Sequence, residues 1–539
     1  MHRRWHLAPR ITALVLLIPL AATLIGVSTA LTMARGPEEL AAALAGRNQL
    51  LAPMLTRLVA WVALGVLAAA AIITVHRMRT RQPAAIRQRF LRSPGWADRE
   101  RDNPNSPRGI KARLGYLLPN ATNPQVSDAS VPLGRDARGR TFLLTCDESV
   151  LVIGPPGSGK DRRVAGPVLA AWPGPVLATS TKTDLAEATW QARAARGPIA
   201  VFDPAGFGLE AGSTLRWNPV TGCEDKDVAA RRAAAIIAGG MPSMNEQFWA
   251  TAATRILRAT LHAAALSTGS ILDACGWATN PTGWIAASEI LRAHGAHEWA
   301  AALRDDADLD PRTSSSIAAT LTGTLIGLSN AKLRSALAPL PAEAPVDLAA
   351  LLAASGTIYA IAPAEPDSHL VYRPWTTLLA SEIAATLREQ AHGRRLEPPA
   401  LLLLNELVHV CPLPELPGLL ADGRGHNIAT MAIVQDPAQL AARYTPDQAR
   451  AITAAAQHRL LLSAGSDDTA REWSELIGTY RMPSRSRTHR PMGFVAQSSS
   501  TSLEQVPIMP AHELRHLPYG CAVMLPRGQP AIPLELFGD

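Results

Sequence analysis

The sequence has little of several residue types that mark small or specialised folds. Its 539 residues include five Cys, and aromatic residues make up only 5%. The Cys stand singly without a C-x-x-C pair, which argues against a disulfide scaffold and a structural zinc site. A hydrophobic share of 47% excludes a disordered or collagen-like chain. The length exceeds one ordinary domain and predicts two to four modules.

An excess of positive over negative residues is confined to the N-terminal region. The formal net charge is +7. Residues 1–113 hold 17 Arg and Lys against 5 Asp and Glu, whereas residues 114–539 hold 35 against 40. The larger part of the chain is therefore mildly acidic. Any contact with DNA must use a local basic lining rather than the net field of the protein.

Two apolar runs near the N-terminus, residues 11–31 and 58–75, predict transmembrane helices, since about 20 residues cross a bilayer core. Arginines precede the first run and follow the second, which places both termini in the cytoplasm and residues 32–57 in an external loop. A cleaved signal peptide is the alternative, but the length of the first run and the second span count against it. We expect a multi-pass anchor in the cell membrane, formed by residues 1–89.

Two segments lack clear periodicity. Residues 90–140 are rich in Arg, Pro, Asn and Gly at first, and they predict a linker followed by the first strands. The second segment, residues 481–490, predicts a basic loop that is either solvated or in contact with DNA or acidic lipid. Its arginines are Arg481, Arg485, Arg487 and Arg490.

The strongest local pattern is a short apolar run, a glycine-rich turn and a helical segment. Residues 149–153 predict a strand and residues 164–171 a helix, around a Gly-x-x-x-x-Gly-Lys spacing. Glycines with positive φ let backbone N–H groups converge on phosphate oxygens, and the lysine reaches the β- and γ-phosphates. The alternative is an incidental glycine-rich turn. The predicted nucleotide-binding residues are Gly154, Pro155, Pro156, Gly157, Ser158, Gly159, Lys160 and Asp161.

Two positions depart from the usual pattern of such a site. A Ser or Thr hydroxyl normally ligates Mg²⁺ at the end of the loop, where this chain has Asp161. Residues 400–404 predict a buried parallel strand that ends in Asn405 and Glu406 instead of Asp-Glu. Glu406 is placed to orient or deprotonate the attacking water, while Asp161 and Asn405 are the candidate Mg²⁺ ligands.

The two departures leave the number of negative charges unchanged, because one carboxylate moves from the strand to the loop. One hypothesis is that each departure compensates for the other. The competing hypothesis is a decayed site, which binds nucleotide and hydrolyses it poorly.

Further motifs follow the phosphate-binding loop in a defined order. They are Lys182 after an apolar strand, Phe202-Asp203-Pro204, Trp217-Asn218-Pro219, Phe248-Trp249, Gly423-Arg424-Gly425, Val434-Gln435-Asp436, Gln439-Leu440, Tyr444 and Arg515 to Gly520. In order and spacing this series resembles the type IV coupling proteins, the TraG- and VirD-type ATPases of conjugative DNA transfer. Ser180 and Asp184 depart from the family's Asp-x-Lys-Gly-Glu motif. The resemblance covers about residues 141–539.

The resemblance implies an α/β fold with a RecA-like P-loop NTPase domain. Residues 141–269 and 340–539 would form this domain, and residues 270–339 an inserted all-α domain. Residues 356–361 predict the return to a buried strand.

The resemblance also implies a homo-hexameric ring with nucleotide between neighbouring subunits. Arg424 matches the family's arginine finger, which would reach the γ-phosphate held by the neighbour, and Gln435 matches a sensor of that phosphate. With Glu406 they form the expected catalytic set. Without the family, Arg424 would be a solvated turn residue and Gln435 a strand-end hydrogen bonder.

The function expected from this resemblance is a membrane-anchored ATPase. It would use ATP and Mg²⁺ to transfer relaxase-bound DNA, expected to be single-stranded, through the proteins of a type IV secretion channel. One alternative, motivated by Asp161 and Asn405, is a scaffold that binds nucleotide, hydrolyses it weakly or not at all, and recruits conjugation substrates. Others are an FtsK-like DNA translocase, which usually carries a winged-helix module that the short C-terminal tail does not suggest, and a coupling ATPase for protein export.

Overall fold

The computed structural model describes residues 38, 84, 86–96, 104–207, 209, 212–241, 247–339, 345–363, 366–487 and 499–538. The chain divides into two compact units, Met1–Gln88 and Arg89–Asp539. The predicted spans at residues 11–31 and 58–75 lie outside the described residues. Among the helices that are described, none has the length and apolar character that crossing a bilayer requires. The membrane anchor therefore stays a prediction.

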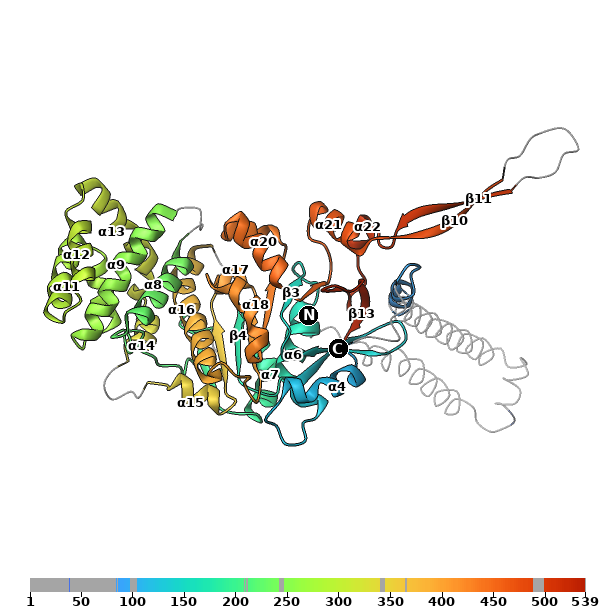
Figure 1. The fold of residues 1–539 in the computed structure, drawn as a ribbon, viewed down its shortest axis with the longest axis horizontal. Helices are drawn as coiled ribbons and strands as arrows, with labels where there is room; N and C mark the ends of the chain where they lie inside the picture. Colours follow the sequence, from blue (N-terminus) through green and yellow to red (C-terminus); the bar gives the residue numbers. More distant parts are fainter. Residues whose placement is uncertain are drawn as a thin grey trace, which may run out of the picture. The chain divides into compact units, whose positions relative to one another are not determined.

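An 11-stranded sheet forms the core of the second unit (Figure 1). Among the described strands, seven adjacent strands run parallel to one another. Four further strands, paired antiparallel, extend the sheet on one side. The predicted strands at residues 149–153, 356–361 and 400–404 all belong to the parallel part. In spatial order the strands are β2 (Thr141–Thr145), β1 (Ser130–Arg135), β13 (Ile532–Leu536), β12 (Cys521–Pro526), β9 (His458–Leu461), β3 (Val150–Ile153), β8 (Ile428–Val434), β7 (Ala400–Leu404), β4 (Val176–Ser180), β6 (Thr357–Ile361) and β5 (Ile199–Phe202).

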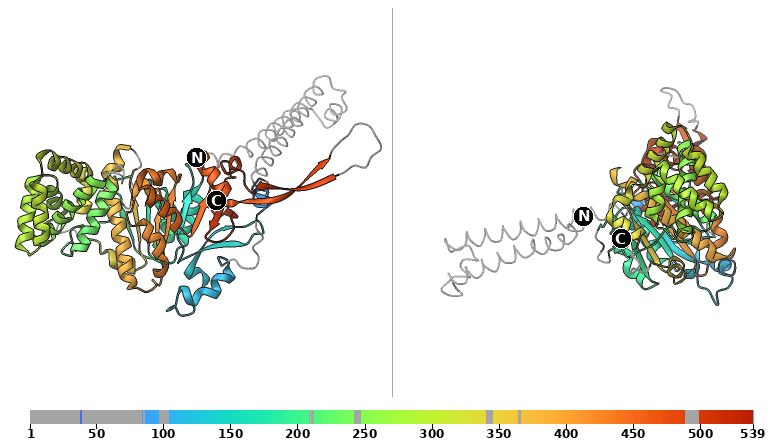
Figure 2. Two further views of the ribbon diagram at one scale, coloured as in Figure 1. Left: turned by 45° about the horizontal axis from the view of Figure 1, so that its top comes forward. Right: turned by 90° about the vertical axis from the view of Figure 1, so that its left-hand side faces the viewer.

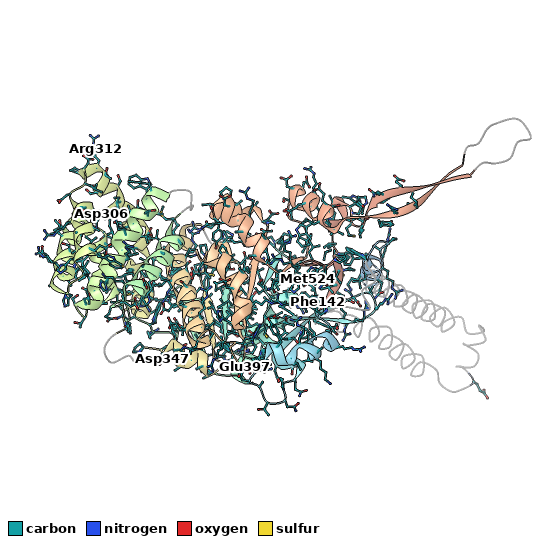
Figure 3. All side chains as sticks on the ribbon, viewed as in Figure 1. Phe142, Asp306, Arg312, Asp347, Glu397 and Met524 are labelled. Atoms are coloured by element: carbon teal, nitrogen blue, oxygen red, sulfur yellow. The ribbon has the colours of Figure 1, made fainter. Side chains whose placement is uncertain are left out.

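Hydrophobic cores cover both faces of this sheet. Leu151 of β3 belongs to one core and Val152 to the other, because successive side chains of a strand point to opposite faces. Phe142 of β2 and Met524 of β12 extend the second core under the antiparallel strands (Figure 3). Strands buried on both faces carry continuous apolar runs, which is why the sequence reveals them.

Helices between β5 and β6 form a layer beside the sheet, at one end of the second unit (Figures 1 and 2). An ion pair between Arg255 and Asp306 joins α9 to α12 within this layer. The expected start of the all-α insertion, residue 270, falls between α9 and α10. The helices are α8 (Lys226–Gly240), α9 (Gln247–Leu266), α10 (Ile271–Ala278), α11 (Pro281–Ala293), α12 (His297–Ala307), α13 (Pro311–Leu325), η3 (Ile326–Ser329), α14 (Ala331–Leu337) and α15 (Leu348–Ala353).

Of the remaining helices, α4 and α5 precede the first strand, and the others lie between later strands. Residues 90–140, expected to be a linker followed by the first strands, contain α4, α5 and β1. The helices are α4 (Pro107–Leu117), α5 (Val126–Ala129), η2 (Asp161–Ala165), α6 (Gly166–Ala171), α7 (Asp184–Ala194), α16 (Pro366–Ala391), α17 (Leu407–Val410), α18 (Leu416–His426), α19 (Ala438–Arg443), α20 (Pro446–Ala455), α21 (Asp467–Ile477) and α22 (Ala511–Leu514).

The basic segment that the sequence predicts as a loop is in part a strand. β10 (Thr479–Arg487) pairs with β11 (Ser499–Pro507) in a two-stranded antiparallel ribbon outside the main sheet. Arg481, Arg485 and Arg487 lie in β10, whereas Arg490 is outside the described residues. A ribbon that does not cover a core needs no alternation of apolar and polar residues, so the sequence pattern does not reveal it.

Candidate active site

The phosphate-binding loop follows β3 and leads directly into a helix, as predicted. Gly157 and Gly159 have φ values of 81° and 90°, which side chains with a Cβ rarely adopt. The helix begins at Asp161 with the π-helical turn η2 and continues as α6. The π-helical turn is a feature that the sequence did not indicate. Such turns are frequent at functional sites, and this one lies where phosphate would meet the helix N-terminus.

Glu406 lies next to this loop. Its carboxylate Oε1 is 2.7 Å from Lys160 Nζ, and both side chains are largely buried. Glu406 has a positive φ of 51°, an unusual conformation for a residue other than glycine. Such backbone strain persists where the surrounding structure enforces it, and it is common at functional sites. The turn after β7 thereby brings the carboxylate to the lysine of the loop.

Gln435 extends this arrangement from the end of β8. Its side-chain amide donates a hydrogen bond to Glu406 Oε2 over 3.1 Å. Its backbone N–H donates to Gln439 Oε1 over 3.0 Å, and the Gln439 amide lies 3.3 Å from His409 Nε2. Burial is the main cause that lowers the pKa of His409. The structure thus brings the two predicted residues Glu406 and Gln435 together with a supporting pair that the sequence did not assign to the site.

The two unusual residues, Asp161 and Asn405, also meet. Asn405 Nδ2 donates to Asp161 Oδ1 over 2.9 Å, and its backbone carbonyl accepts from Thr179 Oγ1 over 2.8 Å. A carboxylate only accepts, so the amide NH₂ faces Asp161 and its oxygen points elsewhere. That oxygen, Asn405 Oδ1, is buried without a hydrogen-bond partner in the described structure. Burial raises the pKa of Asp161, against the opposing effects of Lys160 and Asn405.

This donor set fits Mg²⁺. The cation prefers carboxylate and amide oxygens, and in phosphate-binding sites it takes one or two protein ligands together with water and phosphate oxygens. Within the described ranges, no group of three or more His, Cys, Asp and Glu side chains could hold a metal ion by itself. Asp161 and Asn405 Oδ1 suit a metal that shares its coordination with phosphate oxygens and water.

Arg424 is not part of this cluster. It lies in the last turn of α18, before β8 begins, whereas Gln435 follows the end of β8. A strand rises about 3.3 Å per residue, so the length of β8 separates the two residues by about 20 Å. Arg424 Nε is 3.2 Å from Asp147 Oδ2, and 52% of the Arg424 side chain is exposed. Of the predicted catalytic residues, Glu406 and Gln435 lie with Lys160 at the edge of the sheet formed by the carboxyl ends of the parallel strands. Arg424 lies at the opposite edge, formed by the amino ends of these strands.

Tyr519 borders the loop on the side away from Glu406. A Cβ added to Gly159 would lie 3.0 Å from the Tyr519 ring, and the Arg163 guanidinium lies 5.0 Å from the ring centre. The strand β12, which Tyr519 precedes, pairs with β9 and not with the strands that carry Glu406 and Gln435. In the sequence, Tyr519 stands in the motif from Arg515 to Gly520, and no role could be assigned to it. Its place beside the loop depends on pairing between strands that are distant in the sequence.

Comparisons with known proteins agree with this fold. The profile of the type IV secretory system conjugative DNA transfer family matches residues 119–535. No curated protein matches the chain. Among solved structures, the unbound bacterial conjugative coupling protein TrwBdeltaN70 is similar, with a TM-score of 0.55 at 14% identity over 72% of this chain and 85% of that one.

Two further TrwB structures are similar and contain ligands. The complex of plasmid coupling protein TrwB with ADP and Mg²⁺ has a TM-score of 0.54 at 14% identity, over 73% of this chain and 85% of that one. The complex of TrwB with a non-hydrolysable ATP analogue has a TM-score of 0.52 at 17% identity, over 72% and 86%. At these identities the likeness is one of fold, a mixed α/β architecture with a large parallel sheet.

Proposed function

Because the chain belongs to the type IV secretory system conjugative DNA transfer family, we propose that it is a membrane-anchored ATPase that drives DNA through a type IV secretion channel. The observation that carries the ATPase proposal is the contact of Lys160 with Glu406 at 2.7 Å, with Gln435 bound to the same carboxylate. A phosphate-binding lysine, a carboxylate base and a polar sensor at one edge of a parallel sheet are the parts that phosphoryl transfer needs.

ATP and Mg²⁺ are the proposed cofactors. The loop from Gly154 to Lys160 would bind the phosphates through its backbone N–H groups, and Asp161 and Asn405 would face the metal. Bound Mg²⁺ neutralises charge on the phosphates. The relatives that bind ADP with Mg²⁺ or an ATP analogue share the fold that positions these residues.

Lys160 gives the site a simple order of events. Its ammonium group is paired with Glu406, and a phosphate would compete for the same charge. When Lys160 turns to the phosphate, the Glu406 carboxylate is free to accept a proton from the attacking water. Gln435 holds the second oxygen of that carboxylate, so the base keeps its orientation.

A ring of identical subunits, six by family resemblance, is proposed for the assembly. Arg424 lies at the edge of the sheet opposite to Lys160 and about the length of β8 from it. An arginine in this place cannot reach the nucleotide of its own subunit, and it suits a head-to-tail neighbour whose site faces it. There it would stabilise the charge that develops on the transferred phosphoryl group.

The proposed localisation is the cell membrane, with predicted spans at residues 11–31 and 58–75 and with both termini in the cytoplasm. The proposed partners are single-stranded DNA, the relaxase bound to it and the proteins of the secretion channel. These partners follow from family membership and not from a contact in the structure.

The test is ATP turnover by the full chain in detergent, with and without Mg²⁺ and single-stranded DNA, beside Lys160→Ala. We expect turnover that requires Mg²⁺, rises with DNA and is lost in the variant. Nucleotide binding without turnover above that of Lys160→Ala would contradict the ATPase and favour the scaffold.

The contact between Asp161 and Asn405 favours compensation over decay, because the carboxylate stays beside the strand position that it replaces. The test is the double exchange Asp161→Thr with Asn405→Asp, which restores the usual pattern. Under compensation, Asp161→Thr alone lowers Mg²⁺-dependent turnover, and the double variant returns to about the parent rate. A large gain over the parent would show that the native pair is a decayed site.

A further inference from the structure

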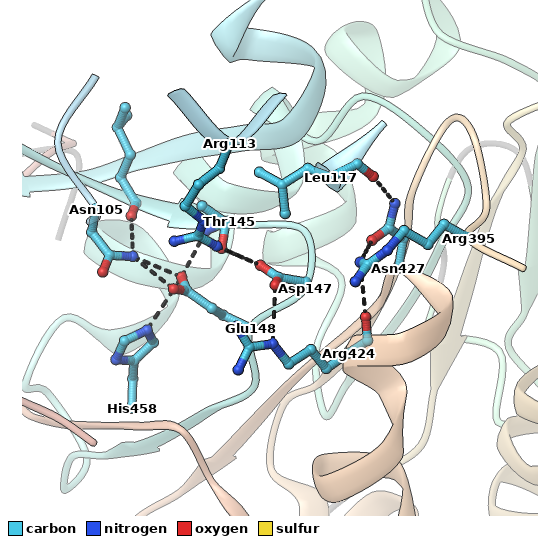
Figure 4. Close-up of polar contacts among 11 residues, drawn as sticks. Asn105, Arg113, Leu117, Thr145, Asp147, Glu148, Arg395, Arg424, Asn427 and His458 are labelled. Atoms are coloured by element: carbon cyan, nitrogen blue, oxygen red, sulfur yellow. Dashed lines mark hydrogen bonds and ion pairs between the residues drawn. The ribbon is translucent and has the colours of Figure 1, made fainter. Parts of the chain in front are cut away.

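Two adjacent carboxylates, Asp147 and Glu148, are buried in the turn between β2 and β3. Figure 4 shows their polar contacts. This turn lies at the edge of the sheet opposite to Lys160, because it leads into β3 and the loop with Lys160 follows β3. The Asp147 side chain has no exposed area. Thr145 Oγ1 donates to Asp147 Oδ1 over 2.6 Å, and Arg113 Nη2 lies 3.3 Å from the same oxygen. These contacts hold the Asp147 carboxylate independently of Arg424.

Arg424 binds the other oxygen of this carboxylate. Its Nε donates to Asp147 Oδ2 over 3.2 Å. Its backbone carbonyl accepts from Arg395 Nη1 over 3.0 Å. The end of α18 is fixed as well, since Asn427 adopts a left-handed conformation with φ of 56° and donates from Nδ2 to Leu117 O over 2.7 Å. Both the backbone and the inner part of the Arg424 side chain are therefore held.

The outer part of the Arg424 guanidinium remains available. A guanidinium has five N–H groups, and the described contacts of Arg424 use only the one on Nε. Half of the side chain is exposed. Asp147 faces two guanidinium groups, those of Arg113 and Arg424, so this carboxylate by itself cannot neutralise both. The terminal nitrogens of Arg424 are thus free to bind an anion outside the subunit.

We propose that Asp147 is a positioning residue for catalysis, which orients Arg424 toward the γ-phosphate held by the neighbouring subunit. The inference rests on the proposed function, because it needs Arg424 to act on a neighbour's nucleotide. A long arginine side chain samples many rotamers when it is free, and a fixed Nε confines the two terminal nitrogens to a narrow arc. An error of about 1 Å in the placement of such a group costs about 100-fold in rate.

Asp147→Asn tests the proposal, because it removes the charge that holds Nε and keeps the size of the side chain. We expect kcat for ATP to fall about 10- to 100-fold. KM and nucleotide binding should change little, since Lys160 and its loop lie at the other edge. In an Arg424→Ala background, Asp147→Asn should cause no further loss of kcat.

Glu148→Gln is the matched control. Glu148 is the adjacent buried carboxylate, but its contacts are with Asn105, Thr145 and His458 rather than with Arg424. We expect it to lower thermal stability and to leave kcat within about threefold of the parent. Equal loss of kcat in Glu148→Gln and Asp147→Asn would overturn the proposal, as would a further loss on adding Asp147→Asn to Arg424→Ala.

A milder variant covers the case in which Asp147→Asn does not fold. Thr145→Val removes the hydroxyl that donates to Asp147 and leaves the carboxylate in place. We expect a loss of kcat of about three- to tenfold that disappears in the Arg424→Ala background. No loss of kcat in Thr145→Val, when Asp147→Asn is not folded, would count against the positioning role. If the parent has no turnover, or if Arg424→Ala has no effect, the proposed function fails and not this inference alone.

Discussion

The two edges of the parallel sheet both carry buried charged groups, but they differ in how these groups are satisfied. At the edge with Lys160, Asn405 Oδ1 and Ser158 Oγ are buried without a hydrogen-bond partner in the described structure. At the opposite edge, both carboxylates have partners: Asp147 accepts three hydrogen bonds, and Glu148 accepts from Asn105 and Thr145. His458, 3.2 Å from Glu148, is also buried there, and its ring nitrogens have no hydrogen-bond partner in the described structure. Buried polar groups without partners are costly, and a bound ligand or ion is one way to supply the missing partner.

This difference assigns a separate task to each edge. Under the proposed function, phosphate and metal would complete the edge with Lys160. At the edge with Asp147, both carboxylates are satisfied within the subunit, and the terminal nitrogens of Arg424 have no described contact. In the proposed ring, the edge of one subunit that carries Lys160 would face Arg424 of the next subunit.

The largest effect is expected for Arg424→Ala. Loss of an arginine finger costs about 1,000-fold or more in kcat, because the charge on the transferred phosphoryl group is no longer stabilised. Arg113→Gln is the control, since Arg113 binds the same Asp147 carboxylate but plays no part in the proposed reaction. We expect turnover of the control to fall by no more than about tenfold, as for Thr145→Val, because Arg113 is one of two groups that hold Asp147 Oδ1. Similar losses in both variants would show that the cluster is only structural.

Glu406→Gln should follow with a loss of kcat of about 100- to 10,000-fold, as expected when a general base is removed. ATP should bind at least as tightly as in the parent, because Lys160 no longer has a carboxylate competing with the phosphate. Single-turnover hydrolysis and equilibrium binding of ATP measure the two quantities separately. Weaker binding together with normal hydrolysis would contradict the role given to Glu406.

Gln435→Ala, at the same edge as Glu406, should lower kcat less than Glu406→Gln does. It removes the hydrogen bond to Glu406 Oε2 and leaves the carboxylate in place. A hydrogen bond to a charged group corresponds to about a tenfold change in rate. The measurement is kcat at saturating ATP, and a loss as large as that of Glu406→Gln would mean that Gln435 itself performs the chemistry.

The smallest effect is expected for Glu148→Gln, at the edge opposite to Lys160, and it concerns the free energy of unfolding. Burial raises the pKa of Glu148, but the interaction with His458 and the bonds from Thr145 and Asn105 outweigh it and lower the pKa overall. A lowered carboxyl pKa stabilises the fold above the pKa of the unfolded chain, and this stability is lost as pH falls through the folded pKa. Glu148→Gln should therefore lower stability by about 1–3 kcal/mol at neutral pH.

Thermal unfolding of the parent and Glu148→Gln at neutral and acidic pH measures this contribution. The gap between their melting temperatures should close as the pH falls below the range in which the Glu148 carboxylate is ionised. A gap that persists unchanged in acid would show that packing, and not charge, accounts for the loss.

The edge with Lys160 could be predicted from the sequence because its parts are local. The apolar runs that form β3 and β7 lead directly into Gly154 and Asn405, and strands of a parallel sheet end at the same edge. The pairing of Asp161 with Asn405 followed from the known parts of a phosphate site. The left-handed backbone of Glu406 did not, because nothing in the residue type indicates it.

The opposite edge could not be predicted, because its contacts join distant segments. Asp147 and Arg424 are 277 residues apart, and neither stands in a pattern that names the other. The antiparallel strands raise the same difficulty, since β1 near residue 134 pairs with β13 near residue 536. Resemblance to the family indicated a role for Arg424 but not the carboxylate that holds it.

The most direct test of the account mixes two inactive variants, Lys160→Ala and Arg424→Ala, and measures Mg²⁺-dependent ATP turnover. In a randomly mixed ring, about one quarter of the interfaces join an intact phosphate loop to an intact Arg424 of the neighbour. The account predicts that the mixture regains up to about one quarter of the parent turnover while each variant alone stays near background. A mixture no more active than the separate variants would contradict a site shared between the two edges.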